Sequence, residues 1–329
     1  MIPHYVLFVH GMGDNREGFS RPLRGLVTDA FRAALARLAP QYPAGCPRER
    51  MPIREVLWSD ITQTDQNHLW NRLFPHLGAR SLLWRSWVTQ PQTWLPRIRY
   101  WAPGREFVLN YLGDPIVYVE SPGINKYEQI HQRLWTAINQ CADDAGQKGA
   151  TADKPALITV VAHSLGSVIV SDLVYDSTVL RRRVWPPKLR LANFVTLGSP
   201  LAIYALRFGL NLVTSFASPI RIQDPNGLWV NLYDPQDILG FPLKPINSAY
   251  DQAVLLDKEI NAGQGWKIWQ WWKQATPLSH TLYWEDETVA ATIGRKAALD
   301  WIRENPFATF PPEQLPQLYT EYKEWLARA

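Results

Sequence analysis

Cysteine is scarce in this chain, which limits the chemistry open to it. The 329 residues include two cysteines, Cys46 and Cys141, and neither belongs to a CxxC pair or to a zinc-ligand spacing. Two cysteines cannot build the disulfide framework that holds small secreted domains together. Histidine and aspartate residues are not grouped at metal-ligand spacings either. We therefore expect neither a metal ion nor an organic cofactor.

Long apolar runs are missing as well. A transmembrane helix needs about 20 uninterrupted apolar residues, and the nearest approach, residues 201–220, contains Arg207, Asn211 and Pro219. The first ten residues lack the basic segment and long apolar segment of a secretory signal. These absences lead us to expect a cytoplasmic protein.

Concentrated positive charge is also rare. The net charge is +4, and the one tight basic run is Arg181-Arg182-Arg183. A nucleic-acid-binding protein would need a basic stripe or a recognised module, so we expect no nucleic-acid partner. The run is a solvated basic surface or, alternatively, a point of attraction to an anionic membrane. Contact with a membrane surface therefore stays open as an additional expectation.

What the chain does have is an alternation of apolar runs and helix-length segments. Hydrophobic residues make up 46% of the chain, enough for a large core. Residues 156–162 are apolar except for Thr159, as in a buried central strand of a parallel sheet. The pattern predicts an α/β protein, with a mostly parallel central sheet flanked by helices. Expected strands are 5–9, 55–58, 156–162, 191–197, 228–233 and 282–284; expected helices are 21–38, 130–142, 165–175 and 287–303.

Tryptophan and proline are abundant, and one segment concentrates them. Residues 61–111 are irregular and hold five of the 16 tryptophans and four of the 26 prolines. A long irregular segment inside a compact domain is typical of a functional lid or an inserted subdomain. We therefore divide the chain into a core of residues 1–60 and 112–329 and a Trp-rich cap or lid at 61–111. The alternative is a set of edge helices packed on the core. A second Trp-rich patch, residues 266–272, is either packing or a wall of the same cleft.

The strongest chemical signal is Ala162-His163-Ser164-Leu165-Gly166, between a predicted strand and a predicted helix. A serine on such a sharp turn has its hydroxyl above the carboxyl ends of the strands. The N-terminus of the following helix favours negative charge at this point. Gly166 meets the need for a small residue after the turn, whereas Ala162 stands where glycine is commoner. The pattern indicates a nucleophilic serine.

A second signal, His10-Gly11-Met12-Gly13-Asp14, follows the first predicted strand. Its glycines let the backbone turn tightly and approach a substrate closely. Acyl transfer needs two N–H donors directed at the oxyanion, and we assign them to the backbone amides of Met12 and Leu165. The competing interpretations are an ordinary glycine turn and a phosphate loop. No Gly-Lys-Ser/Thr follows, which excludes the phosphate loop.

Together these motifs resemble the α/β-hydrolase superfamily, in particular lipase-like and esterase-like serine hydrolases with a short His-Gly-X oxyanion loop. The resemblance covers residues 5–303 apart from the Trp-rich segment. Leu197-Gly198-Ser199-Pro200 follows a strand as it does in many lipase-like relatives. The segments 229–237 and 279–283 are similar to the acid and histidine segments of such proteins. The resemblance implies a Ser-His-Asp triad and no cofactor.

The superfamily places the triad in the chain order serine, acid, histidine. Of the seven histidines, only His280 follows Ser164, so His280 is the expected base. The acid should lie in a loop just after a strand, which leaves Asp234 and Asp237. Asp237 is preferred because apolar residues behind it would help to bury it, and because the relatives' pattern places the acid there. Asp234, next to a proline, is the alternative acid or a cap of the turn.

A triad alone does not identify the substrate. The Trp-rich segment, if it covers the serine, favours an apolar acyl chain, so we expect hydrolysis of a lipid-like or other hydrophobic carboxylic ester. A thioester or amide on the same triad is the alternative, as is a non-catalytic lipid-binding or scaffold module. Apolar residues at helical spacing in 311–329 predict a helix that docks on this or another subunit. The oligomeric state is left open.

Overall fold

A parallel six-stranded sheet forms the centre of the protein. A computed structural model describes residues 1–13, 15–40, 47–73, 114, 118, 125–208, 219–262, 277–306 and 311–328. All the strand pairs in this sheet are parallel, in the order β2-β1-β3-β4-β5-β6. The strands are β1 (His4–Val9), β2 (Ile53–Val56), β3 (Ala156–His163), β4 (Leu189–Leu197), β5 (Leu228–Tyr233) and β6 (Leu256–Glu259). The predicted α/β class with a parallel central sheet is confirmed.

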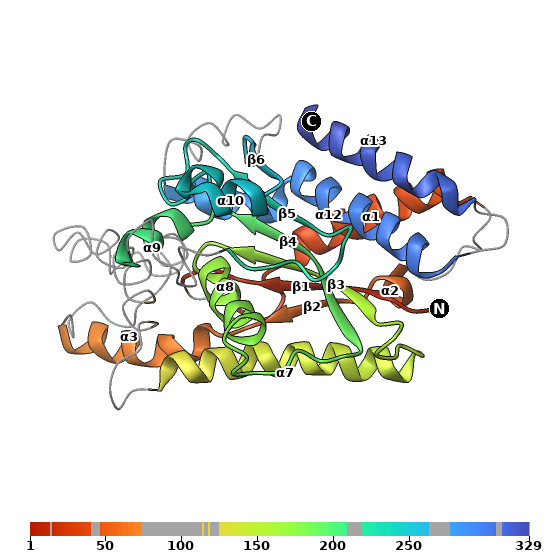
Figure 1. The fold of residues 1–329 in the computed structure, drawn as a ribbon. Coiled ribbons are helices and arrows are strands. Elements are labelled where there is room, and N and C mark those ends of the chain that lie inside the picture. Colours follow the sequence, from red (N-terminus) through yellow and green to blue (C-terminus); the bar gives the residue numbers. More distant parts are fainter. Residues whose placement is uncertain are drawn as a thin grey trace.

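Helices cover both faces of the sheet (Figure 1). One face carries α7 (Lys126–Gln147) and α8 (Leu165–Thr178), with α3 (Ser59–Leu73) beside α7. The other face carries α1 (Arg21–Leu38), α12 (Glu287–Glu304) and α13 (Leu315–Arg328). Shorter elements are α2 (Pro47–Arg50), α9 (Leu201–Phe208), η3 (Lys244–Ile246), α10 (Ser248–Ala253), η4 (Pro277–Glu285) and η5 (Pro312–Gln314).

The strand sequences explain why helices cover both faces of the sheet. In β1, Tyr5, Leu7 and Val9 pack on the α7–α8 side, whereas Val6 and Phe8 pack on the α1–α12 side. This division follows from the two-residue period of a strand. Every residue of β1 and β3 is buried. Strands that are apolar on both faces therefore belong at the centre of the sheet.

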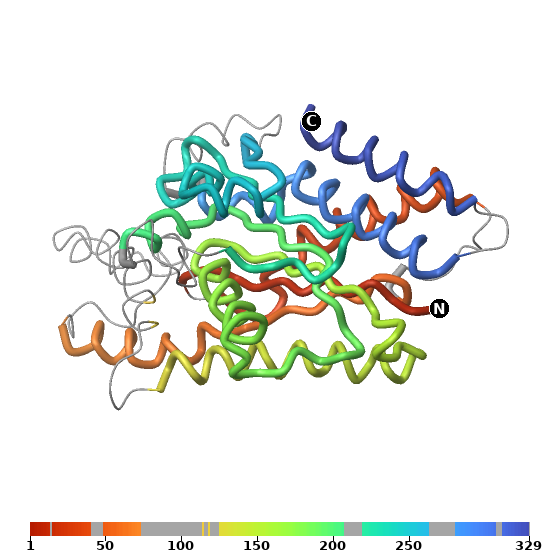
Figure 2. The backbone as a smooth tube through the Cα atoms, viewed as in Figure 1, coloured from red at the N-terminus to blue at the C-terminus, as the bar shows by residue number. Residues whose placement is uncertain are grey.

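The chain just before β1 is held by the residue that follows α12, far along the sequence (Figure 2). Asn305, directly after α12, accepts a hydrogen bond from the Ile2 amide at 2.8 Å and donates one to the Ile2 carbonyl at 2.8 Å. β1 pairs with β2 on one side and β3 on the other. Residues separated by 303 positions thus close the core.

Several predicted elements differ from the structure. The expected strand at 282–284 is wrong: these residues belong to the 3₁₀ helix η4, and all three side chains are buried rather than alternating between two faces. The expected strand at 55–58 lies earlier, at β2, which leaves Trp58 beyond the strand. β6 was missed because its sequence, Leu-Asp-Lys-Glu, carries a single apolar residue.

The Trp-rich segment begins differently from the expectation. Residues 61–73, predicted to be irregular, belong to α3, which starts at Ser59 and so crosses the proposed boundary at residue 60. Its Trp70 is fully buried. Residues 74–111 lie outside the described residues, as does the second Trp-rich patch at 266–272. The helix expected near the C-terminus is α13, and it packs on α12 of the same chain.

Candidate active site

Ser164 occupies a strained turn between β3 and α8. Its backbone angles are φ 53° and ψ −131°, and Ser164 is one of two non-glycine residues with positive φ in the described parts of the chain. Such a conformation costs about 1–3 kcal/mol and persists only where the surroundings enforce it. The Ser164 amide continues the sheet ladder by donating to the Leu197 carbonyl at 2.9 Å. The Ser164 hydroxyl is buried, and none of the described groups hydrogen-bonds to it.

Two glycines allow the loop after β1 to lie directly on this turn. A Cβ on Gly11 would stand 2.4 Å from the Ser164 Cβ, and one on Gly166 would stand 2.4 Å from the His10 carbonyl oxygen. Real side chains do not tolerate such distances, so both positions require glycine. Ala162, two residues before Ser164, is buried and fits at the position where glycine is commoner. The two sequence motifs therefore meet in space at the carboxyl ends of β1 and β3.

His10 is a structural part of the loop. Its Nδ1–H donates to the Gly11 carbonyl at 2.7 Å, and its Nε2 accepts from the Trp58 amide at 3.0 Å. The Trp58 indole stacks on the ring at 4.7 Å and donates to the His10 carbonyl at 3.0 Å. Burial lowers the pKa of His10 to about 4, although its bond to Gly11 opposes this shift. His10 is therefore neutral near pH 7 and holds the loop in one shape.

Polar side chains fix the remainder of the loop around Met12. The Gly13 amide donates to the Asp114 carboxylate at 2.8 Å. The Asn15 side-chain amide donates to the Gly11 and Met12 carbonyls, each at 3.3 Å. Met12 thus lies in a braced loop next to the serine, and Leu165 is the first residue of α8. The bracing by Asn15 and Asp114 was not predicted from the sequence, because neither residue belongs to a motif.

His280 and Asp237 form a buried pair. His280 lies in η4, and its Nδ1 is 2.8 Å from both carboxylate oxygens of Asp237, which follows β5. The side chains are 2% and 0% exposed. A carboxylate can only accept, so Nδ1 carries the proton, and Nε2 is the atom that can take another. The structure thus brings these two predicted residues together.

Two further donors fix the Asp237 carboxylate. The Leu239 amide donates to Oδ1 at 3.0 Å, and the Tyr283 hydroxyl donates to Oδ2 at 2.9 Å. Burial alone would raise the pKa of Asp237, but the hydrogen bond and charge of His280, with these two donors, lower it below its usual value. Asp237 is therefore ionised near neutral pH. Tyr283 was not singled out from the sequence, where it was only part of an apolar run.

Asp234, the alternative acid, has other partners. Its carboxylate accepts from the Gln236 amide at 2.8 Å and from the Ala262 amide at 2.9 Å. Its own amide donates to the Tyr283 hydroxyl at 2.8 Å. These contacts make Asp234 a cap of the turn, and the residue that contacts His280 is Asp237.

His163, directly before the serine, links the two halves of the site. Its Nε2–H donates to the His280 carbonyl at 2.6 Å, and the two rings lie 4.6 Å apart. Burial first, and the neighbouring His280 second, lower the pKa of His163 to about 3. A neutral His163 therefore ties the end of β3 to η4. The position beside the serine was the one sequence signal for this role.

The acid also depends on close-packed glycines. Gly198, with φ 52°, would place a Cβ 2.6 Å from the Asp237 Oδ2, and Gly240 would place one 2.8 Å from the same atom. The Leu197-Gly198-Ser199-Pro200 segment thus makes room for the acid. This contact gives that segment a physical reason beyond resemblance.

The described residues contain no group of three or more histidine, cysteine, aspartate or glutamate side chains that could hold a metal ion. None of the described helices is long and apolar enough to cross a membrane.

No family model matches the chain, and no curated protein matches it either. The site's arrangement must therefore be interpreted from its own geometry.

Proposed function

We propose that this chain is a serine hydrolase of the α/β-hydrolase type that cleaves carboxylic esters with a hydrophobic acyl group. The observation that carries the proposal is the buried His280–Asp237 pair, 2.8 Å apart, next to a serine turn with φ 53°. A carboxylate that fixes the Nδ1–H tautomer of a histidine is the arrangement that prepares Nε2 as a general base. A serine on a sharp strand-to-helix turn is the nucleophile that such a base activates.

In the proposed reaction, His280 Nε2 takes the proton of the Ser164 hydroxyl as the oxygen attacks the ester carbonyl. Asp237 stabilises the imidazolium that forms, without taking the proton itself. The amides of Met12 and Leu165 donate to the developing oxyanion. Collapse expels the alcohol, which receives the proton from His280. Water then attacks the acyl carbonyl while His280 takes its proton, and collapse releases the carboxylic acid as this proton passes from His280 to the Ser164 oxygen.

A hydrophobic acyl group is supported by apolar side chains at the same end of the sheet. Ile238, beside Asp237, is 59% exposed, and Leu206 of α9 is 69% exposed. Both follow the carboxyl ends of strands, as Ser164 does. Apolar surface near a reacting centre gains free energy by covering an apolar chain.

The proposal is tested by labelling with a fluorophosphonate and locating the adduct by peptide mass spectrometry. Ser164 should be labelled in the native chain, and Ser164→Ala and His280→Ala should abolish labelling and esterase activity. Ser171→Ala is the matched control, because Ser171 is a buried serine on the same helix, and it should retain both. Absence of labelling in the native chain, with or without detergent, would reject the hydrolase and favour a lipid-binding module.

The bond cleaved is determined by a panel of esters, thioesters and anilides that share one acyl group. The ester should give the highest kcat/KM, and it should rise with acyl length from acetyl to octanoyl. A thioester or anilide that exceeds the ester by tenfold or more would assign the same site to a thioesterase or amidase instead.

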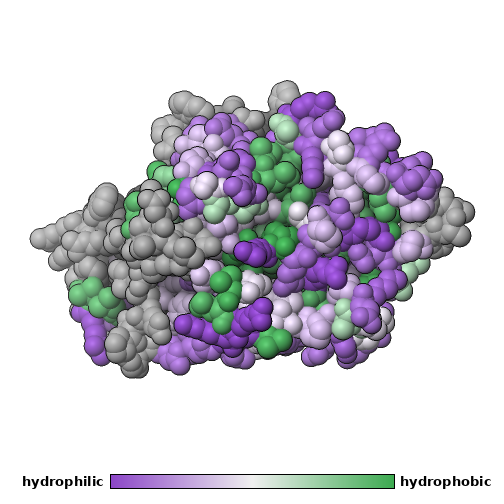
Figure 3. All heavy atoms as spheres, in the orientation of Figure 1, coloured by the Kyte–Doolittle hydropathy of each residue, from purple (hydrophilic) through white to green (hydrophobic). Residues whose placement is uncertain are grey.

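Contact with an anionic membrane surface is a separate part of the proposal. After α8, Val179, Leu180 and Val184 are 43%, 45% and 84% exposed, and the exposed Arg181 and Arg182 lie between them. On the face shown in Figure 3, strongly apolar and strongly polar residues adjoin near α8. Apolar side chains among arginines suit the boundary of an anionic lipid layer.

Flotation with vesicles tests this contact. The protein should float with phosphatidylserine-containing vesicles and not with phosphatidylcholine alone. Leu180→Ser with Val184→Ser, and separately Arg181→Gln with Arg182→Gln, should reduce flotation without changing hydrolysis of a soluble ester. Flotation that neither pair changes would exclude this loop as the contact.

A further inference from the structure

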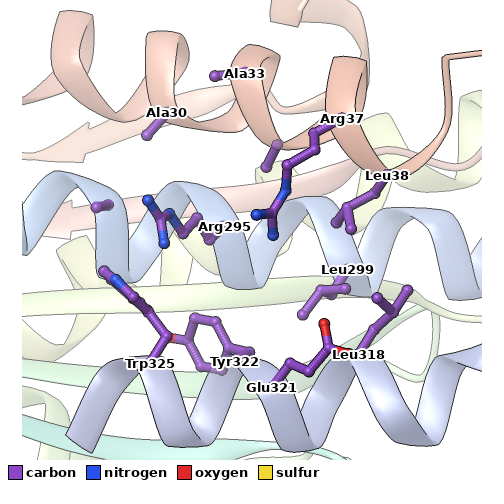
Figure 4. Close-up of a pocket in the computed structure, with 12 residues that line it drawn as sticks. Ala30, Ala33, Arg37, Leu38, Arg295, Leu299, Leu318, Glu321, Tyr322 and Trp325 are labelled. Carbon is purple, nitrogen blue, oxygen red and sulfur yellow. The ribbon is translucent and has the colours of Figure 1, made fainter. Parts of the chain in front are cut away.

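Three helices line a cavity, partly open to solvent, on the α1–α12–α13 face of the sheet (Figure 4). Its volume is about 230 Å³. α1 and α12 pack so closely that a Cβ on Gly294 would lie 2.7 Å from the Ala30 Cβ. α13 stands farther off, because Tyr322 and Trp325 project between it and the other two helices. The cavity thus results from small residues on one side and aromatic residues on the other.

The cavity shares no lining residue with the candidate active site. Ser164, Asp237 and His280 lie at the carboxyl ends of the strands, whereas the cavity lies outside the layer formed by α1 and α12. The proposed hydrolysis therefore gives no reason for this space or for the side chains that line it.

Two arginines line the cavity without an acidic partner. Arg37 reaches from α1 toward α12, and Arg295 belongs to α12 (Figure 4). Neither forms an ion pair with any described carboxylate. The Arg295 guanidinium lies 4.1 Å from the centre of the Trp325 ring. Burial first, and the charge of Arg37 second, lower the pKa of Arg295. The two cations thus raise each other's electrostatic energy.

Other arginines show that the chain does provide partners elsewhere. Arg303 binds both oxygens of Asp224, at 2.9 and 2.7 Å, and Arg133 binds both oxygens of Asp60. A guanidinium gains most from such a bidentate carboxylate contact. Arg37 and Arg295 make no such contact with a described carboxylate.

The remaining lining limits the ligand. Glu321 also lines the cavity, and its carboxylate accepts from the Gln317 amide at 2.9 Å. Two arginines and one glutamate give the lining a net formal charge of +1. A monoanion therefore balances the charge, and a dianion exceeds it. The other walls are apolar, including Ala30, Leu299 and Leu318.

The volume of the cavity limits the size of the ligand. A cavity of about 150 Å³ holds a benzene molecule, so one of about 230 Å³ has room for a ligand with somewhat more than six non-hydrogen atoms. We propose that the cavity binds a small organic monocarboxylate, with its carboxylate between Arg37 and Arg295 and a short apolar body against the alanine and leucine walls. Hexanoate, with eight non-hydrogen atoms, matches both the charge and the space.

Calorimetric titration with hexanoate tests the inference. The titration uses the full-length Ser164→Ala chain, so that binding is measured without turnover. Hexanoate should bind one to one, and Arg37→Gln and Arg295→Gln should each weaken it at least about tenfold. Arg32→Gln, an exposed arginine of the same helix that pairs with Asp29, should leave the affinity unchanged. Unchanged affinity in both cavity variants would overturn the proposal.

Ligand charge and cavity shape are tested separately. Hexanol and hexyltrimethylammonium should bind at least tenfold more weakly than hexanoate, and hexyl phosphate no more tightly. Binding of hexanol as tight as that of hexanoate would refute the role of the arginines, and tighter binding of hexyl phosphate would refute the monocarboxylate. Ala33→Leu should fill the cavity and weaken hexanoate binding while both arginines remain.

A last comparison separates this site from the proposed active site. In the chain that retains Ser164, Arg37→Gln and Arg295→Gln should leave ester hydrolysis unchanged. A parallel loss of hydrolysis and hexanoate binding in these variants would mean that hexanoate binds elsewhere or that the fold has changed. Circular dichroism and thermal unfolding of each variant distinguish these two causes, and either one counts against the assignment.

Discussion

Two buried carboxylates in this protein have similar hydrogen-bond partners but belong to different hydrogen-bond networks. Asp237, after β5, accepts from the Tyr283 hydroxyl at 2.9 Å and lies 2.8 Å from His280 Nδ1. Asp300, on α12, accepts from the Tyr319 hydroxyl at 2.8 Å and lies 2.6 Å from Lys296 Nζ. Each combines a carboxylate with a tyrosine and a nitrogen donor, and in each the pKa of the aspartate is lowered.

The two clusters differ in where their hydrogen bonds end. Around Asp300 they join side chains of β1, β3, β4 and α12: Asn193 donates to the second oxygen at 2.8 Å and to Thr159 at 2.9 Å, and His4 bonds to Thr159 at 2.8 Å. Around Asp237 they reach the His280 imidazole, and the His280 carbonyl accepts from His163, the residue before Ser164. A buried network that joins several strands fixes packing, whereas the network of Asp237 ends at the histidine that the proposed reaction uses.

The largest effect is expected from Asp237→Asn. An asparagine offers its amide to the ring and favours the wrong imidazole tautomer, so kcat for ester hydrolysis should fall by about 10⁴-fold. Activity assays with an excess of substrate measure this. Asp234→Asn is the matched control, because among the described residues its carboxylate accepts from backbone amides and not from His280, and it should retain most activity. Equal losses in both variants would remove the distinction between the acid and the turn cap.

Lys296→Met tests the cluster around Asp300. It leaves Asp300 ionised and buried without its cation, so the free energy of unfolding should fall by about 3–5 kcal/mol. Denaturant titration measures the fall, while kcat per folded molecule should not change. The double variant Lys296→Met, Asp300→Leu should recover much of the stability. A loss of kcat as large as that of Asp237→Asn would contradict a purely structural role.

The two tyrosines permit the same small deletion in both clusters. Tyr319→Phe should lower the free energy of unfolding by about 1–2 kcal/mol and spare kcat. Tyr283→Phe should lower kcat by about tenfold, because the Asp237 carboxylate loses a donor that orients it. The loss of this donor also raises the pKa of Asp237, so the acid limb of the pH–rate profile should move to higher pH. If both variants changed only stability, the positioning role of Tyr283 would be rejected.

The smallest effect is expected in acid. Both aspartates have a folded-state pKa below the unfolded value of about 3.9. Their stabilisation is complete above that value and is lost as the pH falls through the lowered folded-state values. The free energy of unfolding should therefore drop below about pH 4, and less steeply in Asp237→Asn and in Asp300→Asn. Identical slopes for the three proteins would disprove the linkage.

The sequence predicted one cluster and not the other for a physical reason. The serine turn and the glycine loop are local signals, because each depends on a short stretch of sequence after a strand, and His280 was predicted because it is the only histidine after Ser164. The helix predicted at 21–38 matches α1, and the strand at 228–233 matches β5, since both have clear periodicity. Lys296 and Asp300 are only four residues apart on α12, but Asn193 and Tyr319 come from other elements, and their pairing with Asp300 left no signal in the sequence.

Within the site, the same limit applied to the supporting residues. Tyr283 was assigned to a strand, because three consecutive large apolar or aromatic residues indicate an extended buried segment. In η4 its hydroxyl instead contacts both Asp237 and the Asp234 amide. The choice of Asp237 over Asp234 relied on apolar residues behind it and on the pattern of the relatives, whereas the structure separates the two by their hydrogen-bond partners.

The link between Ile2 and Asn305 has a consequence for the newly made chain. At about 5–20 residues per second, a ribosome takes roughly 15–60 s to add the 303 residues between the two partners. Until then, the start of β1 lacks its clamp and α12 is not available to cover that face of the sheet. A nascent chain must keep its most apolar strands from aggregating throughout this interval. The sheet face that α12 covers can therefore be completed only after residue 305 has been synthesised.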